Sequence, residues 1–250
     1  MPGVENPRRK FAGKERDHPP VNGTPSMIAK LVLQNTGFVM VMGALLFASA
    51  GTLHWPGAWT FLATSAVLGP AFGIWLAKTD PALLAERMRL TARDEQPAAD
   101  KKFVLAIVAA LVIWLITMGI DRRIDASDIS FVLQALGLAM YLLSMGFIMW
   151  VFHENSFAAP VVKVQAEREH HVISTGPYAW VRHPMYSSMM LFFIGVPLLL
   201  GSWWGVAMLP VFVVLFAIRM RIEERTLVAG LPGYADYKAH VRYRLVPGLW

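Results

Sequence analysis

The sequence predicts an all-α, polytopic membrane protein with about six transmembrane helices, a C-terminal helical hairpin and a pocket on the cytoplasmic side. Three observations lead to this fold class. The chain is 56% hydrophobic with a mean hydropathy of +0.46, which is more apolar than ordinary soluble domains. Its apolar residues gather in runs of about 20, the length that crosses a bilayer as a helix. Its charged residues lie mainly between these runs.

Four apolar runs predict four transmembrane helices within residues 27–152, with a cytoplasmic loop at 78–102. The four runs are Leu31–Ala50, Ala58–Ala77, Phe103–Ile120 and Phe131–Phe152. Inside the loop, Asp80 followed by Pro81 is typical of a helix start. We therefore expect a short helix there, lying on the cytoplasmic face with solvated sides.

The fifth apolar run, Met185–Ile218, contains no charged residue and is too long for one span. Gly201 and Ser202 lie in its middle, where they favour a tight turn. Trp203 and Trp204 follow them, and tryptophans prefer the membrane interface. This run therefore predicts a helical hairpin of two short spans, kinked near its two prolines.

The basic residues set the predicted orientation. All of the 23 lysines and arginines except Arg122 and Arg123 fall on one side when six spans are assumed. Cytoplasmic loops carry an excess of Lys and Arg, so both termini are predicted to be cytoplasmic. If the source is bacterial, the membrane is the inner or plasma membrane. Residues 1–26 are polar and form a predicted disordered cytoplasmic tail. Because topology explains the net charge of +6, membrane lipids are the expected partners, and no nucleic acid is.

Two polar clusters flank the hairpin. The first is VQAEREHHVISTGPYAWVRHPMY, residues 164–186, and the second is RMRIEERTL, residues 219–227. The hairpin returns the chain to the cytoplasmic face, so the clusters should meet although they lie about forty residues apart. Arg219 and Glu223 are four residues apart and would share a helix face. Ionisable groups at membrane depth are costly and often functional, although some of these arginines could be simple interfacial anchors.

Several chemistries find no support in the sequence. Without cysteine there is no disulfide, thiolate metal site or cysteine nucleophile. His170 and His171 are adjacent and point in different directions on any regular element, and no HExxH pattern occurs, so no metal is expected. No glycine-rich phosphate loop and no GxSxG serine elbow is present either.

From about residue 164 to the C-terminus the sequence resembles the isoprenylcysteine carboxyl methyltransferase family. These integral-membrane enzymes use S-adenosylmethionine and are related to the phospholipid methyltransferases. The resemblance rests on an ordered set of motifs, QxERxHHVISTGPY, RHPMY, RxRxEERTL and GYADYKAHVRYRLVPGLW. It implies that residues 153–250 form the methyltransferase core, while the earlier spans match only as a hydrophobic pattern.

The resemblance also implies roles for individual residues. Glu223 resembles the carboxylate that meets the cofactor's amino group, and Arg219 resembles the residue that faces the substrate. With Glu224, Arg219 makes up the predicted catalytic pair. The predicted cofactor-binding residues are Gln165, His170, His171, Val172, Ile173, Tyr178, His183, Pro184, Met185, Tyr186 and Glu223. One departure from the family pattern is Ser188, where a glycine is common.

The chemistry of the acceptor stays open at this point. Methyl transfer from a sulfonium needs positioning and desolvation rather than a protein nucleophile. A carboxylate acceptor, such as a prenylcysteine C-terminus, needs an orienting cation, and the Arg219 guanidinium suits this role. An amine acceptor, in a phospholipid or a small amphiphile, needs a general base such as Glu224 or a histidine.

Two further classes compete with a methyltransferase. Sterol-type reductases, which use NADPH, resemble the chain near RHPxY but typically continue as RHPNYxGD. Here Ser188 is followed by Met189 instead of that Gly-Asp pair, which favours the methyltransferase. A membrane scaffold without enzymatic activity would leave both polar clusters without a role.

Overall fold

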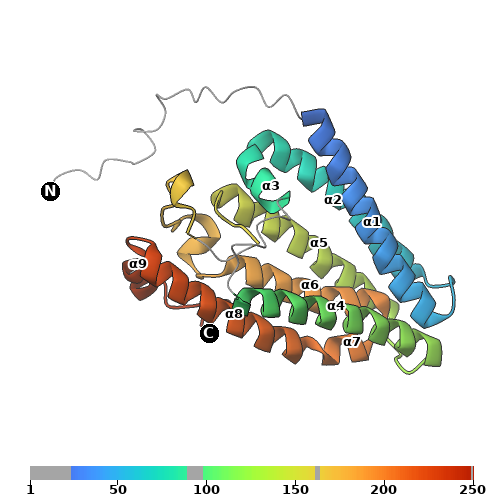
Figure 1. The fold of residues 1–250 in the computed structure, drawn as a ribbon. Helices are drawn as coiled ribbons and strands as arrows, with labels where there is room; N and C mark the ends of the chain where they lie inside the picture. The colour runs from blue at the N-terminus through green and yellow to red at the C-terminus, as the bar shows by residue number, and fades with distance from the viewer. Residues whose placement is uncertain (1–23, 89–97, 161–163, 249) are drawn as a thin grey trace.

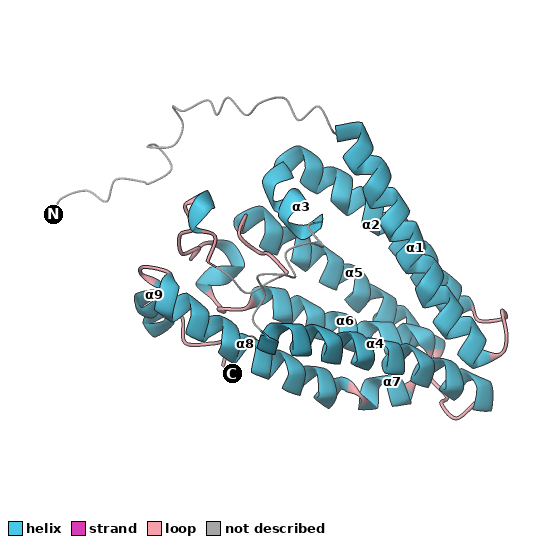
Figure 2. Cartoon of the chain, in the orientation of Figure 1, coloured by secondary structure: helices cyan, strands magenta, loops and turns pink. Residues whose placement is uncertain are grey.

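The computed structural model describes residues 24–88, 98–160, 164–248 and 250. Helices and the segments that connect them make up this described part of the chain, and it contains no strand (Figures 1 and 2). The predicted all-α fold class is confirmed. Of the predicted tail, residues 1–23 lie outside the described residues, and the remaining three already belong to the first helix. Residues 89–97 of the predicted loop also lie outside them.

The first four predicted spans are all helices. Each helix is longer than the apolar run that predicted it. The fourth helix begins at the same residue as its run and is longer only at its C-terminal end. The four helices are α1 (Thr24–Ala50), α2 (Pro56–Thr79), α4 (Ala98–Ile124) and α5 (Phe131–Glu154). Among the described residues, five helices are long and apolar enough to cross a bilayer, these four and Trp203–Gly230.

The predicted hairpin forms, and its turn lies where the sequence indicated. The first arm is α6 (Pro184–Leu200), and the second consists of α7 (Trp203–Ala207) and α8 (Leu209–Gly230). Gly201 ends α6 in the left-handed conformation, with φ of 77°. Ser202 then caps α7, its hydroxyl accepting from the Gly205 N–H at 3.0 Å. The α6 arm has 17 residues and is shorter than the other apolar helices, and Pro210 opens α8 instead of kinking it.

Helices α5 and α6 pack closely because glycines line their contact. A Cβ placed on Gly137 of α5 would lie 2.6 Å from the carbonyl oxygen of Gly195 in α6 and would also collide with the Leu199 backbone nitrogen. A Cβ on Gly195 would lie 2.8 Å from the Gly137 carbonyl oxygen. The two backbones therefore touch directly, which fixes α6 and the residues at its N-terminal end.

We expect Gly137→Ala to destabilise the protein by about 1–3 kcal/mol, because the added methyl group overpacks a backbone contact. Gly146→Ala on the same helix is the matched control, since nothing lies within 4 Å of a Cβ there. The control should be neutral or slightly stabilising, because alanine favours helix over glycine. Thermal unfolding in detergent measures both. Equal melting temperatures for the two variants would contradict the close approach.

The short helix expected after Asp80 is α3 (Pro81–Met88), and the Asp80 carboxylate accepts from the Leu83 N–H at 2.9 Å. One part of its surface is exposed, at Pro81, Ala82 and Ala85, and the remainder is not solvated as predicted. Leu83 and Leu84 are buried against Val151 of α5 and against α2, and Glu86 is buried as well. Helix α3 is therefore a fixed part of the bundle.

The segments predicted to be cytoplasmic gather at one end of the bundle (Figure 1). This end carries α3, α9 (Tyr234–His240) and the connection between α5 and α6. That connection contains two short 3₁₀ helices, Ala166–Arg168 and Gly176–Ala179. The turn between α6 and α7 lies at the opposite end, as does the C-terminal end of α4 with Arg122 and Arg123.

Candidate active site

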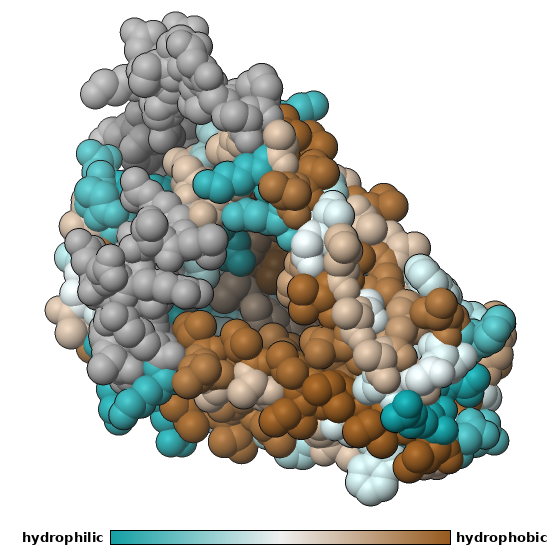
Figure 3. All heavy atoms as spheres, turned by 45° about the vertical axis from the view of Figure 1, so that its right-hand side comes forward, coloured by the Kyte–Doolittle hydropathy of each residue, from teal (hydrophilic) through white to brown (hydrophobic). Residues whose placement is uncertain are grey.

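A cavity of about 560 Å³ is lined by residues of α3, of α9 and of the α5–α6 connection, among others. Its volume is in the usual range for small-molecule sites. One wall is polar and comes from the α5–α6 connection, the start of α6, the end of α8 and α9. The other wall is apolar and comes from α1, α2, α4 and α5. Figure 3 shows a hollow in the surface, with hydrophobic residues below it and to its right and hydrophilic residues above it.

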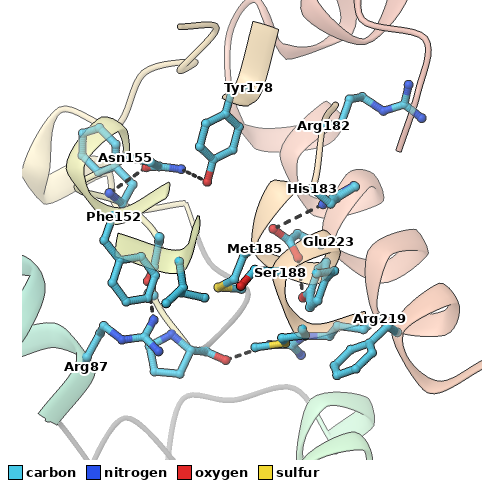
Figure 4. A pocket seen from close by; sticks show the side chains of 18 of the residues that line it. Arg87, Phe152, Asn155, Tyr178, Arg182, His183, Met185, Ser188, Arg219 and Glu223 are labelled. Carbon is cyan, nitrogen blue, oxygen red and sulfur yellow. Dashed lines mark hydrogen bonds and ion pairs between the residues drawn. The ribbon is translucent and has the colours of Figure 1, made fainter. Parts of the chain in front are cut away.

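The polar wall brings the two predicted clusters together. Ten of the predicted site residues line the cavity: His170, His171, Val172, Ile173, Tyr178, His183, Met185, Tyr186, Arg219 and Glu223. Figure 4 shows Tyr178, His183 and Met185 on one side and Glu223 and Arg219 from α8 beside them. The return of the hairpin produces this meeting, as the sequence indicated.

Glu223 presents its carboxylate to the cavity. Its Oε2 accepts a hydrogen bond from the Tyr186 hydroxyl at 2.9 Å, and its Oε1 lies 4.0 Å from His183 Nδ1 (Figure 4). The side chain is 27% exposed, so part of the carboxylate remains accessible. The carboxylate is therefore held in place by Tyr186 and can still accept from a ligand.

Glu224, the neighbouring residue, does not line the cavity. Its side chain is 3% exposed and is surrounded by cationic groups. It meets Arg182 Nε at 2.7 Å, His183 Nε2 at 3.2 Å, Lys238 Nζ at 3.2 Å and Arg244 Nε at 3.3 Å. Its carboxylate is directed at these side chains and away from the cavity, so it is not positioned to take a proton from a ligand there. The structure thus shows Glu224 as the centre of an ion-pair network, and its catalytic assignment stays a prediction.

Two other predicted cofactor residues also lie outside the cavity lining, Gln165 and Pro184. Gln165 is fully buried, and its amide donates to the Phe157 carbonyl at 2.9 Å while its oxygen accepts from Arg168 at 2.6 Å. Pro184 is the buried first residue of α6. Gln165 thus contacts a residue that lines the cavity, Phe157, and Pro184 lies between two residues that line it, His183 and Met185.

Arg219 lies where the polar and apolar walls meet. Its Nη2 donates to the Pro160 carbonyl at 2.9 Å, and its guanidinium lies 5.0 Å from the centre of the Phe103 ring on α4. The side chain is buried, with 4% exposed. A cation at such a boundary can hold the charged end of a molecule whose remainder is apolar.

The segment before the first cluster contributes residues that the sequence did not single out. Phe157 stacks on His170, with ring centroids 4.3 Å apart. Asn155 donates to the Tyr178 hydroxyl at 2.8 Å and accepts from the Phe157 N–H at 2.8 Å. Burial, followed by the neighbouring charges of His171 and Arg168, lowers the pKa of His170 to about 4, so this ring is neutral at physiological pH.

Ser188, the departure from the family pattern, is buried with 1% exposed. Its hydroxyl donates to the Ser144 carbonyl of α5 at 2.7 Å, so it adds a hydrogen bond to the close α5–α6 contact.

The apolar wall of the cavity includes Phe38 from α1, Phe72 from α2 and Phe103 from α4. No group of three or more His, Cys, Asp or Glu side chains able to hold a metal occurs in the part of the chain that the structure describes.

These features define a multi-span helical membrane protein with a cavity that joins a polar pocket to an apolar one. Comparisons with known proteins agree. A model of the phospholipid methyltransferase family matches residues 132–231. The protein-S-isoprenylcysteine O-methyltransferase of Saccharomyces cerevisiae is 34% identical over 84 residues, which are 32% of this chain and 35% of that one. The match thus spans about a third of that relative's length.

A solved structure has the same fold. It is the eukaryotic intramembrane Ras methyltransferase, isoprenylcysteine carboxyl methyltransferase, with a TM-score of 0.53 and 19% sequence identity. The match covers 86% of this chain and 75% of that one. Together the three comparisons confirm the resemblance to the isoprenylcysteine carboxyl methyltransferase family.

Proposed function

We propose that the protein is a membrane methyltransferase that uses S-adenosylmethionine to esterify the carboxylate of a lipophilic acceptor, such as a prenylated cysteine at a protein C-terminus. The observation that carries the proposal is the division of one cavity into a polar and an apolar wall with Arg219 at their junction. A water-soluble methyl donor and a lipid-tailed acceptor need such a shared space at the membrane border.

The polar wall suits S-adenosylmethionine. The Tyr234 hydroxyl is buried in this wall and has no hydrogen-bond partner among the described residues, so it can pair with a ligand. Glu223 offers a carboxylate for an amino group, and Tyr178 offers an aromatic face. When bound, the cofactor supplies an electrophilic methyl group, which an acceptor oxygen takes as the carbon–sulfur bond breaks and leaves a neutral thioether.

The charges near the cavity favour a carboxylate acceptor over an amine. An amine must lose a proton before it can attack, and this requires a base. The carboxylate of Glu224 is enclosed by cations, and the low pKa of His170, about 4, makes it a weak base. A carboxylate needs no base and is oriented by a guanidinium, which Arg219 supplies. The proposal is therefore O-methylation.

The sidedness of basic residues supports a cytoplasmic location for the cavity and both termini. The apolar wall, formed by spanning helices, would then receive the acceptor's lipid tail from the cytoplasmic leaflet. Phe38, Phe72 and Phe103 line the cavity on this side. Membrane lipids are the expected surroundings of these helices.

Calorimetry on detergent-purified protein is the first test, with S-adenosylmethionine and NADPH as separate ligands. We expect the first to bind and the second not to. Labelled methyl groups should then pass to N-acetyl-S-farnesylcysteine as a base-labile ester. Binding of NADPH alone would replace the proposal with a reductase, and base-stable label on a lipid amine would replace it with N-methylation.

Arg219→Gln should lower kcat/KM for N-acetyl-S-farnesylcysteine by roughly 10- to 100-fold, the effect of losing a charge-assisted hydrogen bond. The Kd for S-adenosylmethionine should stay close to that of wild type, because the proposed cofactor contacts remain. Arg221→Gln is the matched control, as Arg221 lies on the same helix but is exposed. Equal losses in both variants, or a loss of cofactor affinity alone, would contradict the role of Arg219.

A further inference from the structure

Arg87 reaches the same cavity from α3 and has no role in the function proposed above. Its Nη1 donates to the Ala158 carbonyl at 2.7 Å, and its guanidinium lies 4.3 Å from the centre of the Phe152 ring. Figure 4 shows it on the side of the cavity opposite Arg219. Neither the cluster motifs nor the apolar pattern pointed to this residue, because α3 lies about 75 residues before the first cluster.

The Arg87 charge has no ionic partner in the part of the chain that the structure describes. Its contacts there are a neutral carbonyl and an aromatic ring. Burial lowers the pKa of Arg87 to about 10, and the guanidinium is still protonated at neutral pH. A desolvated cation that faces a cavity attracts an anion into that cavity.

Arg87 and Arg219 hold the same short stretch of chain. Arg87 donates to the carbonyl of Ala158 and Arg219 to that of Pro160, two residues further on. Each guanidinium also lies over a phenylalanine at the edge of the apolar wall. The two cations thus approach the junction of the walls from opposite sides (Figure 4).

Helix α3 is well placed to fix Arg87. Leu83 and Leu84 are buried in a hydrophobic cluster with Leu76, Val151 and Phe152. The arginine therefore projects from an anchored element, so little side-chain and backbone freedom is lost when it binds a ligand.

We propose that Arg87 is a second acceptor-binding residue, which together with Arg219 holds the carboxylate of the acceptor at the junction of the two walls. This inference rests on the proposed function, because it requires an acceptor with a carboxylate and an apolar tail. It adds a specificity element, since Arg87 would make the protein prefer an anionic acceptor over a neutral one of the same shape.

The test compares N-acetyl-S-farnesylcysteine with its neutral carboxamide, binding each to protein saturated with S-adenosylhomocysteine so that no turnover occurs. Wild type should bind the acid more tightly than the amide. In Arg87→Gln the Kd of the acid should rise roughly tenfold, while the Kd values of the amide and of S-adenosylmethionine stay constant. Arg225→Gln is the control, because Arg225 is exposed at the same end of the bundle and lies outside the cavity lining.

A purely structural Arg87 would give a different pattern. Equal weakening of acid and amide in Arg87→Gln, or an unchanged preference for the acid, would overturn the inference while the proposed function stands. If wild type itself shows no preference for the acid, the inference and the carboxylate acceptor fail together. Binding of S-adenosylmethionine is measured separately and tests the proposed function alone.

Arg87→Lys keeps the inference testable if the glutamine variant does not fold. A lysine in this desolvated position loses its proton more readily than arginine does. The preference of this variant for the acid should therefore decline as pH rises from 7 to 9, a range below the Arg87 pKa of about 10, while the preference of wild type stays nearly constant. A preference that does not change with pH in the lysine variant would overturn the inference.

Discussion

Glu224→Ala is expected to lower the stability of the protein by about 3–5 kcal/mol, the usual cost of leaving buried charges without their partner. Glu224 joins Arg182, His183, Lys238 and Arg244, so its loss exposes several cations to mutual repulsion. In a chain of this size, each kcal/mol corresponds to about 2–4 °C, so Tm should fall by roughly 10 °C. Thermal unfolding in detergent measures the change.

The loss of stability should extend to the C-terminal segment, because Arg182 binds both Glu224 and the backbone of that segment. Arg182 Nη1 donates to the carbonyls of Val241 and Arg242, at 2.7 and 2.8 Å, and its backbone N–H donates to that of Tyr243 at 2.9 Å. Limited proteolysis after residue 230 should therefore become faster in Glu224→Ala. Asp128→Asn, at an exposed position, should change neither Tm nor proteolysis. A variant with wild-type Tm but no methyl transfer would restore the catalytic interpretation of Glu224.

The apolar spans and the hairpin could be predicted because their signals are local. A run of about 20 apolar residues requires a helix whatever its neighbours are, since no other structure satisfies the backbone within lipid. The turn at Gly201 and Ser202 is equally local, because glycine and serine interrupt an otherwise uniform run. The meeting of the two polar clusters then follows from the hairpin alone.

The roles of Glu223 and Glu224 could not be separated from the sequence. Adjacent residues on a helix point about 100° apart, so one faces the cavity while the other faces the packing partner. Which of them faces the cavity depends on the rotation of α8. That rotation is set by contacts with Arg182 and with the C-terminal segment, which are distant in sequence. The cofactor-binding role that the family resemblance gives Glu223 stays a prediction, and nothing in the sequence indicated the enclosure of Glu224.

Arg87 escaped prediction for a related reason. A charged residue in a polar loop normally lies on a solvated helix face, and nothing in the sequence of α3 distinguishes it from that case. Its position depends on the burial of Leu83 and Leu84 against α2 and α5. Phe157 and Asn155 were missed because their importance lies in their contacts with His170 and Tyr178.

Glu223→Gln is the second substitution with a large expected effect, on cofactor binding instead of stability. The glutamine oxygen can still accept from the Tyr186 hydroxyl, which lies 2.9 Å from the carboxylate, so the fold should be kept. Loss of the charge should raise the Kd for S-adenosylmethionine roughly 10- to 100-fold, as expected for a hydrogen bond to a charged group. His183→Ala is a less specific test, because the His183 ring also contacts Glu224 at 3.2 Å.

Calorimetry with two ligands shows which part of the cofactor Glu223 meets. S-adenosylmethionine and S-adenosylhomocysteine share the amino group, but only the first carries the sulfonium charge. If Glu223 binds the amino group, as the family resemblance implies, Glu223→Gln should weaken both ligands by the same factor. If only the sulfonium form is weakened, Glu223 faces the reacting centre, and the proposed arrangement of cofactor and acceptor is reversed. Wild-type affinity for both ligands would remove Glu223 from the cofactor site altogether.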